Sequence, residues 1–232
     1  AIEAAKLAEY VVFVAGLDST VEGEGWFLDK EADEKGGGAV ARPDRPSQTV
    51  LLPGMQNELI NEIAKVNPNI ILVVISGGTC SVTPVINNVK GLLYAFYPGQ
   101  EGGRAIADVL LGNYNPSGKL PATIPKDDSQ IIPISPDFRN MVSRGVGYRW
   151  FDSQNLTPEF AFGFGLSYTT FKVGEAKVFN VEAEPGENVE LSVPVTNAGK
   201  TDGTETIQVF VRKTGDTDGP LKTLKAFQRI AV

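Results

Sequence analysis

Residues 69–75 read Asn-Ile-Ile-Leu-Val-Val-Ile, a run in which six aliphatic side chains follow one another without a polar interruption. Continuous apolar runs of this length are typical of strands that are buried on both faces of a parallel sheet. The stretch before this run carries apolar side chains at helical spacing, namely Leu59, Ile60, Ile63 and Ala64. The sequence therefore predicts an amphipathic helix that leads into a central, buried strand.

Strand and helix patterns also alternate on both sides of this run. Residues 10–17 form a second continuous apolar stretch, preceded by a short helical pattern over 1–9, and residues 91–97 form a third, followed by a helical pattern over 101–111. Alternating strands and helices favour a parallel sheet with helices packed on both faces. We expect residues 1–125 to form such an α/β sandwich domain.

The second half of the chain has a different character. Prolines recur and periodicity is weak over 126–170, which is typical of an extended linker that wraps the surface. Apolar and polar residues then alternate over 188–196 and 206–213, with a turn pattern at 197–200. We expect 171–232 to form a partial immunoglobulin-like or fibronectin type III-like β-sandwich, truncated because such domains need about 100 residues.

Composition excludes several function classes. The net charge is −7 and the charges of both signs are interspersed, which argues against nucleic acid as a partner. No apolar run reaches the ~18 residues of a membrane span, so we expect no membrane partner. Histidine is absent, which excludes Ser-His-Asp catalysis and His-ligated metal within this chain, and the single Cys80 excludes an internal disulfide. We expect neither a metal nor a cofactor.

The remaining chemistry points to carboxylates in the segment after residue 17. Glu24 lies between Gly23 and Gly25, and Trp26 follows two residues later. A general acid needs apolar neighbours that weaken its acidity, and glycines allow a loop to bring it close to a substrate, while an indole ring stacks well on a sugar face. The alternative is that Glu22 and Glu24 are solvated loop charges and Trp26 belongs to the core.

Three further patterns have a structural and a functional interpretation. Residues 29–45, rich in charge and glycine, fit a surface insertion and, as an alternative, a lid over a substrate. Gly99, Gly102 and Gly103 fit close packing of strand and helix better than a phosphate cradle, because their spacing is not the dinucleotide fingerprint. Asn155 begins an Asn-Leu-Thr tripeptide, a possible glycosylation acceptor.

Five blocks in chain order resemble the C-terminal region of the family 3 glycoside hydrolases, the β-glucosidase and β-xylosidase group. The blocks are Val-Glu-Gly-Glu-Gly-Trp at 21–26, Asp-Arg at 44–45 with Leu-Leu-Pro-Gly-Met-Gln at 51–56, Tyr-Pro-Gly-Gln-Glu-Gly-Gly at 97–103, Asn-Pro-Ser-Gly-Lys-Leu-Pro at 115–121, and Phe-Gly-Phe-Gly-Leu-Ser-Tyr-Thr at 162–169. Together they cover most of the chain.

The resemblance implies a division of catalytic labour. In this family the general acid/base glutamate comes from the α/β sandwich, which places that role on Glu24, with Glu22 as the fallback and Trp26 as a substrate-binding platform. The nucleophilic aspartate lies on an N-terminal barrel that this chain lacks. The family's Asp-Arg pair usually follows the glutamate closely, so either Asp44-Arg45 or Asp29-Lys30 is its counterpart here.

The function implied is part of an exo-acting retaining β-glucosidase that acts on terminal non-reducing β-D-glucosyl residues. Its partners are a β-glucoside or oligosaccharide substrate and the barrel domain or chain of the same enzyme. The expected location is secreted or periplasmic. Two alternatives stay open, a β-xylosidase of the same family and a non-catalytic carbohydrate-binding or scaffold fragment.

Overall fold

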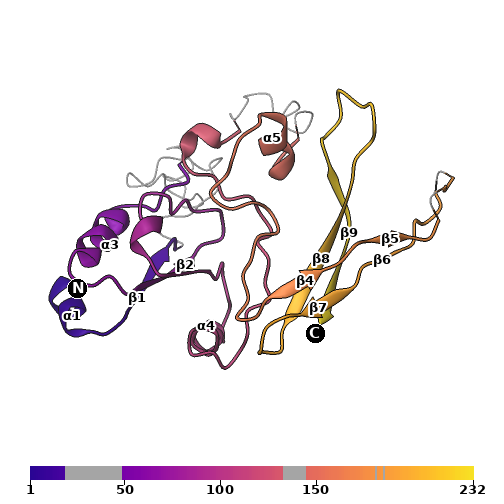
Figure 1. The fold of residues 1–232 in the computed structure, drawn as a ribbon. Helices are drawn as coiled ribbons and strands as arrows, with labels where there is room; N and C mark the ends of the chain where they lie inside the picture. The colour runs from indigo at the N-terminus through magenta and orange to yellow at the C-terminus, as the bar shows by residue number, and fades with distance from the viewer. Residues whose placement is uncertain (19–48, 133–144, 181, 185) are drawn as a thin grey trace. The chain divides into compact units, whose positions relative to one another are not determined.

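The computed structural model describes residues 1–18, 49–132, 145–180, 182–184 and 186–232 (Figure 1). The chain divides into two compact units, one made of residues 1–106 and 121–162 and the other of residues 107–120 and 163–232. In the described ranges no helix is long and apolar enough to cross a membrane. The expected domain boundaries at residues 125 and 170 stay predictions.

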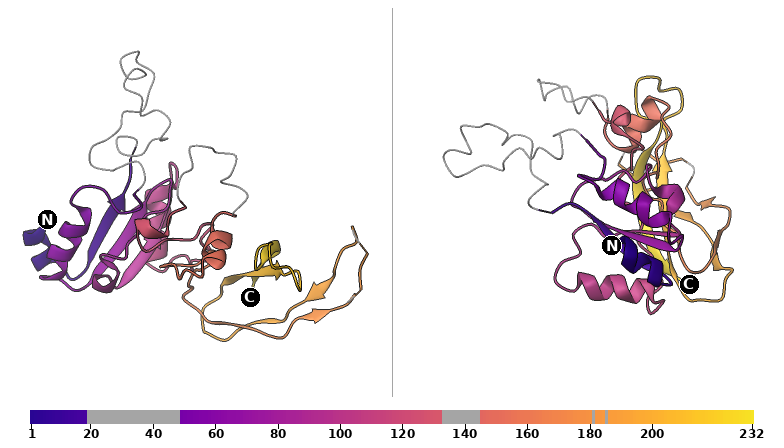
Figure 2. Two further views of the ribbon diagram at one scale, coloured as in Figure 1. Left: turned by 90° about the horizontal axis from the view of Figure 1, so that it is seen from above. Right: turned by 90° about the vertical axis from the view of Figure 1, so that its left-hand side faces the viewer.

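The described residues of the first unit form a three-stranded parallel sheet with the order β1-β2-β3. The strands are β1 (Val11–Gly16), β2 (Ile70–Ile75) and β3 (Gly91–Tyr94). Figure 2 shows them side by side with helix α3 (Gln56–Ala64) against the sheet. The predicted parallel α/β arrangement of this part is confirmed.

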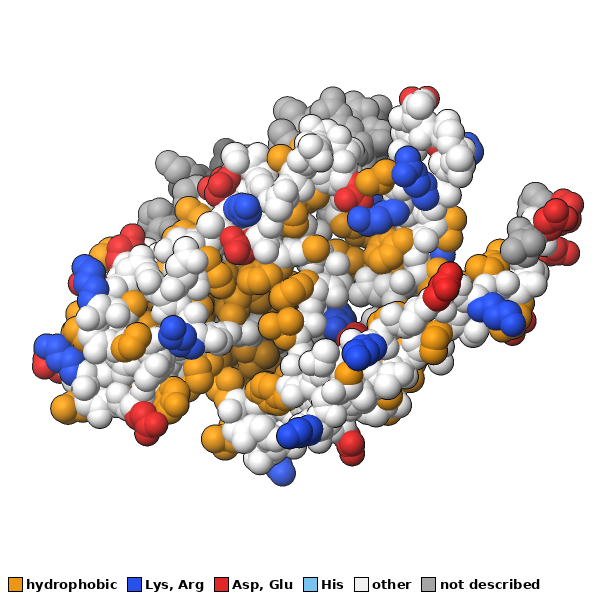
Figure 3. Space-filling view, in the orientation of Figure 1, with side chains coloured by type: hydrophobic (Ala, Val, Ile, Leu, Met, Phe, Trp, Pro, Cys, Tyr) orange, Lys and Arg blue, Asp and Glu red, His pale blue; other side chains and the backbone are white. Residues whose placement is uncertain are grey.

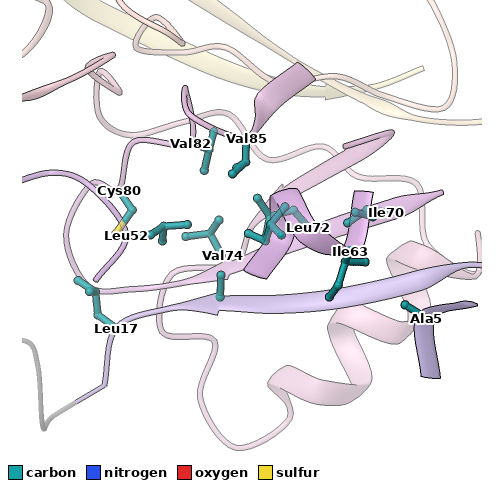
Figure 4. Close-up of a cluster of buried hydrophobic side chains, with 12 residues drawn as sticks. Ala5, Leu17, Leu52, Ile63, Ile70, Leu72, Val74, Cys80, Val82 and Val85 are labelled. Carbon is teal, nitrogen blue, oxygen red and sulfur yellow. The ribbon is translucent and has the colours of Figure 1, made fainter. Parts of the chain in front are cut away.

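The core of this unit lies between the sheet and its helices α1 (Ile2–Leu7) and α3 (Figure 4). Ile70, Leu72 and Val74 of β2 have no exposed surface, and they pack in one cluster with Ile60 and Ile63 of α3. The near-continuous aliphatic sequence of β2 is explained by its central position, because both of its faces and both of its edges are covered.

The remaining elements of the first unit are short. They are the 3₁₀ turns η2 (Ile86–Asn88) and η3 (Asp128–Gln130), the helix α5 (Tyr148–Ser153), and the start of helix α4 (Gly102–Leu110), whose last residues are assigned to the second unit. Residues 121–162 belong to this unit: an antiparallel bridge joins Ile124 and Phe160 within this stretch, and the Ser81 hydroxyl donates to the Lys126 carbonyl.

In its described residues the second unit holds three two-stranded antiparallel sheets, β4 with β7, β5 with β6, and β8 with β9. Their bounds are β4 (Phe171–Val173), β5 (Lys177–Val178), β6 (Leu191–Ser192), β7 (Val195–Asn197), β8 (Thr204–Val211) and β9 (Thr223–Ala231). The predicted single strand over 188–196 is divided into β6 and β7 at Pro194, which has no N–H to donate to a ladder. The turn at 197–200 does not join β7 to β8 as a hairpin, because β8 pairs with β9.

Candidate active site

The predicted acid/base segment lies outside the described residues. Glu22, Glu24 and Trp26 all fall within 19–48, as do both candidate Asp-Arg counterparts at 29–30 and 44–45. The structure nevertheless describes the two points at which this segment leaves and rejoins the first unit.

The segment leaves from the carboxyl end of β1. Leu17, which is buried, donates its N–H to the Ile75 carbonyl at 2.8 Å, so the chain stays paired with β2 up to this point. At Gly16 the Gln56 side chain closes the outer edge of the strand, since its Oε1 accepts from Gly16 N at 2.8 Å and its Nε2 donates to Gly16 O at 3.0 Å. The departure point is therefore fixed by hydrogen bonds on both edges of β1.

The segment rejoins the unit beside the loop that follows β2. The Val50 N–H donates to Asp128 Oδ1 at 2.7 Å, and the Val50 carbonyl accepts from Ser81 N at 2.6 Å. Leu51 and Ser81 form a parallel bridge, and Ser81 is itself buried. Because Ser81 comes shortly after the carboxyl end of β2, both ends of the segment are held near the carboxyl ends of the parallel strands. In open α/β sheets this is the side on which ligands bind.

A buried tyrosine supports this side of the sheet. Tyr94, the last residue of β3, donates its hydroxyl to the Cys80 carbonyl at 2.8 Å, and its ring packs edge-on against Phe160. Burial, followed by the charges of Cys80 and Glu159, raises the pKa of Tyr94 well above its ordinary value of 10.0. Tyr94 is thus a protonated hydrogen-bond donor that ties β3 to the loop after β2, and not a group that exchanges protons near neutral pH.

A second polar contact lies close to this tyrosine. The Thr83 hydroxyl donates to Glu159 Oε2 at 2.6 Å, which connects the loop after β2 to residues 121–162. Two residues after Tyr94, Phe96 has a positive φ of 52°, a conformation that is rare for an aromatic residue. Strained residues of this kind concentrate at functional sites, which is consistent with a ligand-facing role for this end of the sheet.

The described ranges hold no group of three or more His, Cys, Asp or Glu side chains placed to bind a metal. On the face drawn in Figure 3, positive and negative side chains are interspersed and neither sign forms a large patch. At the carboxyl side of the sheet, the described residues contribute hydrogen bonds and packing that hold the two ends of the 19–48 segment.

The comparison with protein families decides the assignment. Residues 1–168 match the model of the glycosyl hydrolase family 3 C-terminal domain. The chain belongs to glycosyl hydrolase family 3. The resemblance inferred from the five sequence blocks is confirmed, and the α/β fold agrees with it.

Individual family 3 proteins match the chain over nearly its whole length. It is 41% identical over 222 residues to a xylan 1,4-beta-xylosidase of Xylanibacter ruminicola, with 96% of this chain covered, and 37% identical over 243 residues to a probable beta-glucosidase I of Aspergillus flavus, with 99% covered. Its fold matches the family 3 beta-glucosidase of Bifidobacterium adolescentis with a TM-score of 0.76 at 32% identity, covering all of this chain.

The family 3 chain spans only part of these relatives. It corresponds to 24% of the Xylanibacter protein, 26% of the Aspergillus protein and 32% of the Bifidobacterium chain. Most of each relative therefore has no counterpart in this sequence.

Sequence reasoning missed the residues that hold the ends of the acidic segment. Gln56, Asp128, Tyr94 and Glu159 act through contacts between positions that are far apart in the chain. For Gln56 a signal was present, since it closes the block at 51–56 that carries part of the family resemblance. The other three stand in stretches without a pattern that predicts their partners.

Proposed function

We propose that this chain supplies the general acid/base of an exo-acting retaining β-glycosidase, most simply a β-glucosidase that hydrolyses terminal non-reducing β-D-glucosyl residues. One observation carries the proposal. The residues on either side of the 19–48 segment, which contains the Gly-Glu-Gly-aromatic motif, are held at the carboxyl side of a parallel sheet. Membership of family 3 supports it, because relatives that match the whole chain are named β-glucosidases and β-xylosidases.

In this proposal Glu24 takes part in both halves of the reaction. Its carboxylic acid first donates a proton to the glycosidic oxygen, so that the aglycone leaves as a neutral alcohol while an aspartate outside this chain bonds to the anomeric carbon. The Glu24 carboxylate then removes a proton from water, whose oxygen displaces the aspartate and releases the sugar. The two carboxyl groups need a separation of about 5 Å for this retaining sequence. Trp26 stacks on the substrate next to the cleaved bond.

The supporting observations about the described residues concern anchoring. A proton-transferring group must be returned to the same place at each turnover, and misplacement by ~1 Å is costly. Hydrogen bonds at Gly16 and Val50 fix the two ends of the segment, and the Tyr94 hydroxyl fixes the neighbouring loop. Such anchoring is expected for a segment that carries a catalytic group. A solvated surface insertion would not require it.

The experiment is the substitution of Glu24 by Gln in the full-length enzyme that contains this chain. Loss of an acid/base predicts a fall in kcat/KM of about 10²–10⁴ for substrates with poor leaving groups, and a smaller effect for activated aryl glycosides. Azide attacks the anomeric carbon of the covalent intermediate without needing a base and displaces the aspartate, so it should raise kcat for activated aryl glycosides and yield a glycosyl azide. Glu22→Gln tests the fallback assignment, and Glu190→Gln, an exposed glutamate of the other unit, is the matched control.

The β-xylosidase alternative rests on one specific observation, the 41% identity to the Xylanibacter xylosidase. The ratio of kcat/KM for aryl β-glucoside and aryl β-xyloside, measured on the full-length enzyme, separates the two. Secretion or export to the periplasm is also proposed, and detection of the protein outside the cytoplasmic fraction of its source tests it.

A further inference from the structure

We propose that Gln56 is a positioning residue for the acid/base of this enzyme. In this inference its side chain fixes the direction in which the 19–48 segment leaves β1, and it acts through Glu24 and not on the substrate itself. The inference rests on the proposed role of Glu24 and extends the catalytic machinery to the first residue of helix α3.

The Gln56 carboxamide pairs with the backbone of Gly16 as a neighbouring strand would. Its Oε1 accepts from Gly16 N at 2.8 Å and its Nε2 donates to Gly16 O at 3.0 Å. On the opposite edge, the next residue is held by β2, since Leu17 N–H donates to Ile75 O at 2.8 Å. In the described part of the chain, one side chain therefore supplies the outer half of the restraint at the last residue of β1.

The helix that carries this carboxamide is itself fixed in place. Four residues after Gln56, Ile60 has no exposed surface, and it packs with Ile63 of the same helix and Leu72 of β2 in the core (Figure 4). Close-packed side chains of this kind leave a helix little freedom to shift. The contact with Gly16 thus extends the rigidity of the core to the point where the chain leaves the sheet.

The direction of departure matters because the proposed acid/base follows it closely. Glu24 lies eight residues after Gly16, and misplacement of a reacting group by about 1 Å can cost about 10²-fold in rate. Gly16 has a φ of +133°, and glycine has more backbone freedom to lose than any other residue. The conformation of the chain at this position therefore depends on outside contacts, and Gln56 provides the one on the outer edge.

Leaving-group dependence separates a positioning role from a merely structural one. In the full-length enzyme, kcat/KM is measured for an alkyl β-glucoside, which needs the acid, and for a dinitrophenyl β-glucoside, whose aryl group leaves without it. The ratio of the two values is independent of the amount of folded enzyme, because the enzyme concentration cancels. Gln56→Met keeps the side-chain length and removes both hydrogen bonds. It should lower kcat/KM by about 10–10²-fold for the alkyl substrate and by less than about threefold for the aryl substrate.

Asn67 offers a matched control at the other end of the sheet. This buried carboxamide also holds backbone, since it donates to Ala5 O at 2.9 Å and to Ala8 O at 2.8 Å, shortly before β1 begins. Asn67→Leu should lower the melting temperature at least as far as Gln56→Met does and leave the ratio unchanged. Where Gln56→Met does not fold, Gln56→Glu keeps the acceptor for Gly16 N–H, loses the donor to Gly16 O, and should lower the ratio in the same direction.

A double-mutant cycle tests whether Gln56 acts through Glu24. In the Glu24→Gln background, Gln56→Met should change kcat/KM for the alkyl substrate by less than about twofold, because the group that Gln56 positions is already lost. A further loss of tenfold or more in this background would show that Gln56 acts on the reaction by another route.

The remaining outcomes distinguish this inference from the proposed function. A ratio that Glu24→Gln lowers and Gln56→Met leaves unchanged would overturn the inference while the role of Glu24 stands. A ratio that Asn67→Leu lowers as far as Gln56→Met does would make Gln56 a general stabilising contact. If neither Glu24→Gln nor Glu22→Gln lowers the ratio, the proposed function is wrong, and the positioning role is lost with it.

Discussion

Gly16 leaves no room for a side chain at the point where the acidic segment departs. Its φ is +133°, and a Cβ at this position would lie 1.8 Å from the Ile75 carbonyl oxygen. The close approach of β1 and β2 and the hydrogen bonds from Gln56 both depend on this glycine. At the scale of single residues, Gly16, which carries no titratable side chain, fixes the point at which the 19–48 segment leaves the sheet.

Gly16→Ala should lower the free energy of unfolding by about 1–3 kcal/mol or more, because the backbone strain is added to a steric clash. Gly103→Ala is the control, since no atom lies within 4 Å of its added Cβ and alanine suits its helix. Urea unfolding of both variants measures the difference. Equal stabilities would contradict the account of Gly16.

The raised pKa of Tyr94 predicts how the folding stability of the chain depends on pH. The pKa of Tyr94 is raised in the folded chain above 10.0, its ordinary value in the unfolded chain. The protonated hydroxyl therefore contributes its full share of the folding stability below pH 10.0, and this share is lost as the pH rises above that value. Tyr94→Phe should cost about 1–3 kcal/mol at pH 8, because the Cys80 carbonyl loses its donor. Between pH 10 and 11 the variant should lose less stability than the parent chain, as measured by urea unfolding; parallel pH profiles would refute this.

At the scale of elements, a polar contact joins the 115–121 block to the long strand β8. Lys119 Nζ lies 2.9 Å from Glu205 Oε1 and donates to the Gly165 carbonyl at 2.8 Å, and both charged side chains are only 16% exposed. Arg229 of β9 donates to the Ser117 hydroxyl at 2.7 Å. Two of the blocks that carry the family resemblance therefore meet within the second unit and serve its structure.

Lys119→Met should destabilise the second unit by about 1–3 kcal/mol, since it leaves the Glu205 carboxylate and the Gly165 carbonyl without this donor. Lys213→Met is the matched control: Lys213 pairs with Asp216 but is 81% exposed, and its loss should cost less than about 1 kcal/mol. Thermal unfolding followed by NMR signals of β8 and β9 compares them. A Lys119 variant no less stable than the Lys213 variant would contradict this role.

The elements also show how far sequence reasoning extends. The runs at 10–17 and 69–75 identify β1 and β2 because continuous aliphatic residues specify strands in a covered parallel sheet. The third run, 91–97, ends early at Tyr94, because Phe96 adopts a positive φ that no periodicity predicts. The contacts of Gln56 and Asp128 depend on tertiary proximity, so the anchoring of the candidate site could not be predicted from local pattern.

At the scale of the whole molecule, the chain corresponds to a quarter to a third of its relatives. The nucleophile of the proposed reaction is expected in the part of such an enzyme that this chain does not cover. The proposed catalysis therefore requires this chain to act together with further polypeptide.

The isolated 232-residue chain should hydrolyse neither aryl β-glucosides nor aryl β-xylosides above the uncatalysed rate, because one carboxylate alone cannot carry out double displacement. A chromogenic assay measures this, with a full-length family 3 enzyme as the positive control. Turnover that co-purifies with the chain and disappears in Glu24→Gln would show that the chain contains its own nucleophile.

The most direct test of the central claim is the activity of the Glu24→Gln variant of the full-length enzyme, measured as kcat/KM for a poor leaving group and as kcat for an activated aryl glycoside with and without azide. We expect a loss of about 10²–10⁴ in kcat/KM for the poor leaving group, a kcat for the activated glycoside that azide raises, and no change in the Glu190→Gln control. An activity close to that of the parent enzyme, unchanged by azide, would contradict the assignment of the acid/base to this segment.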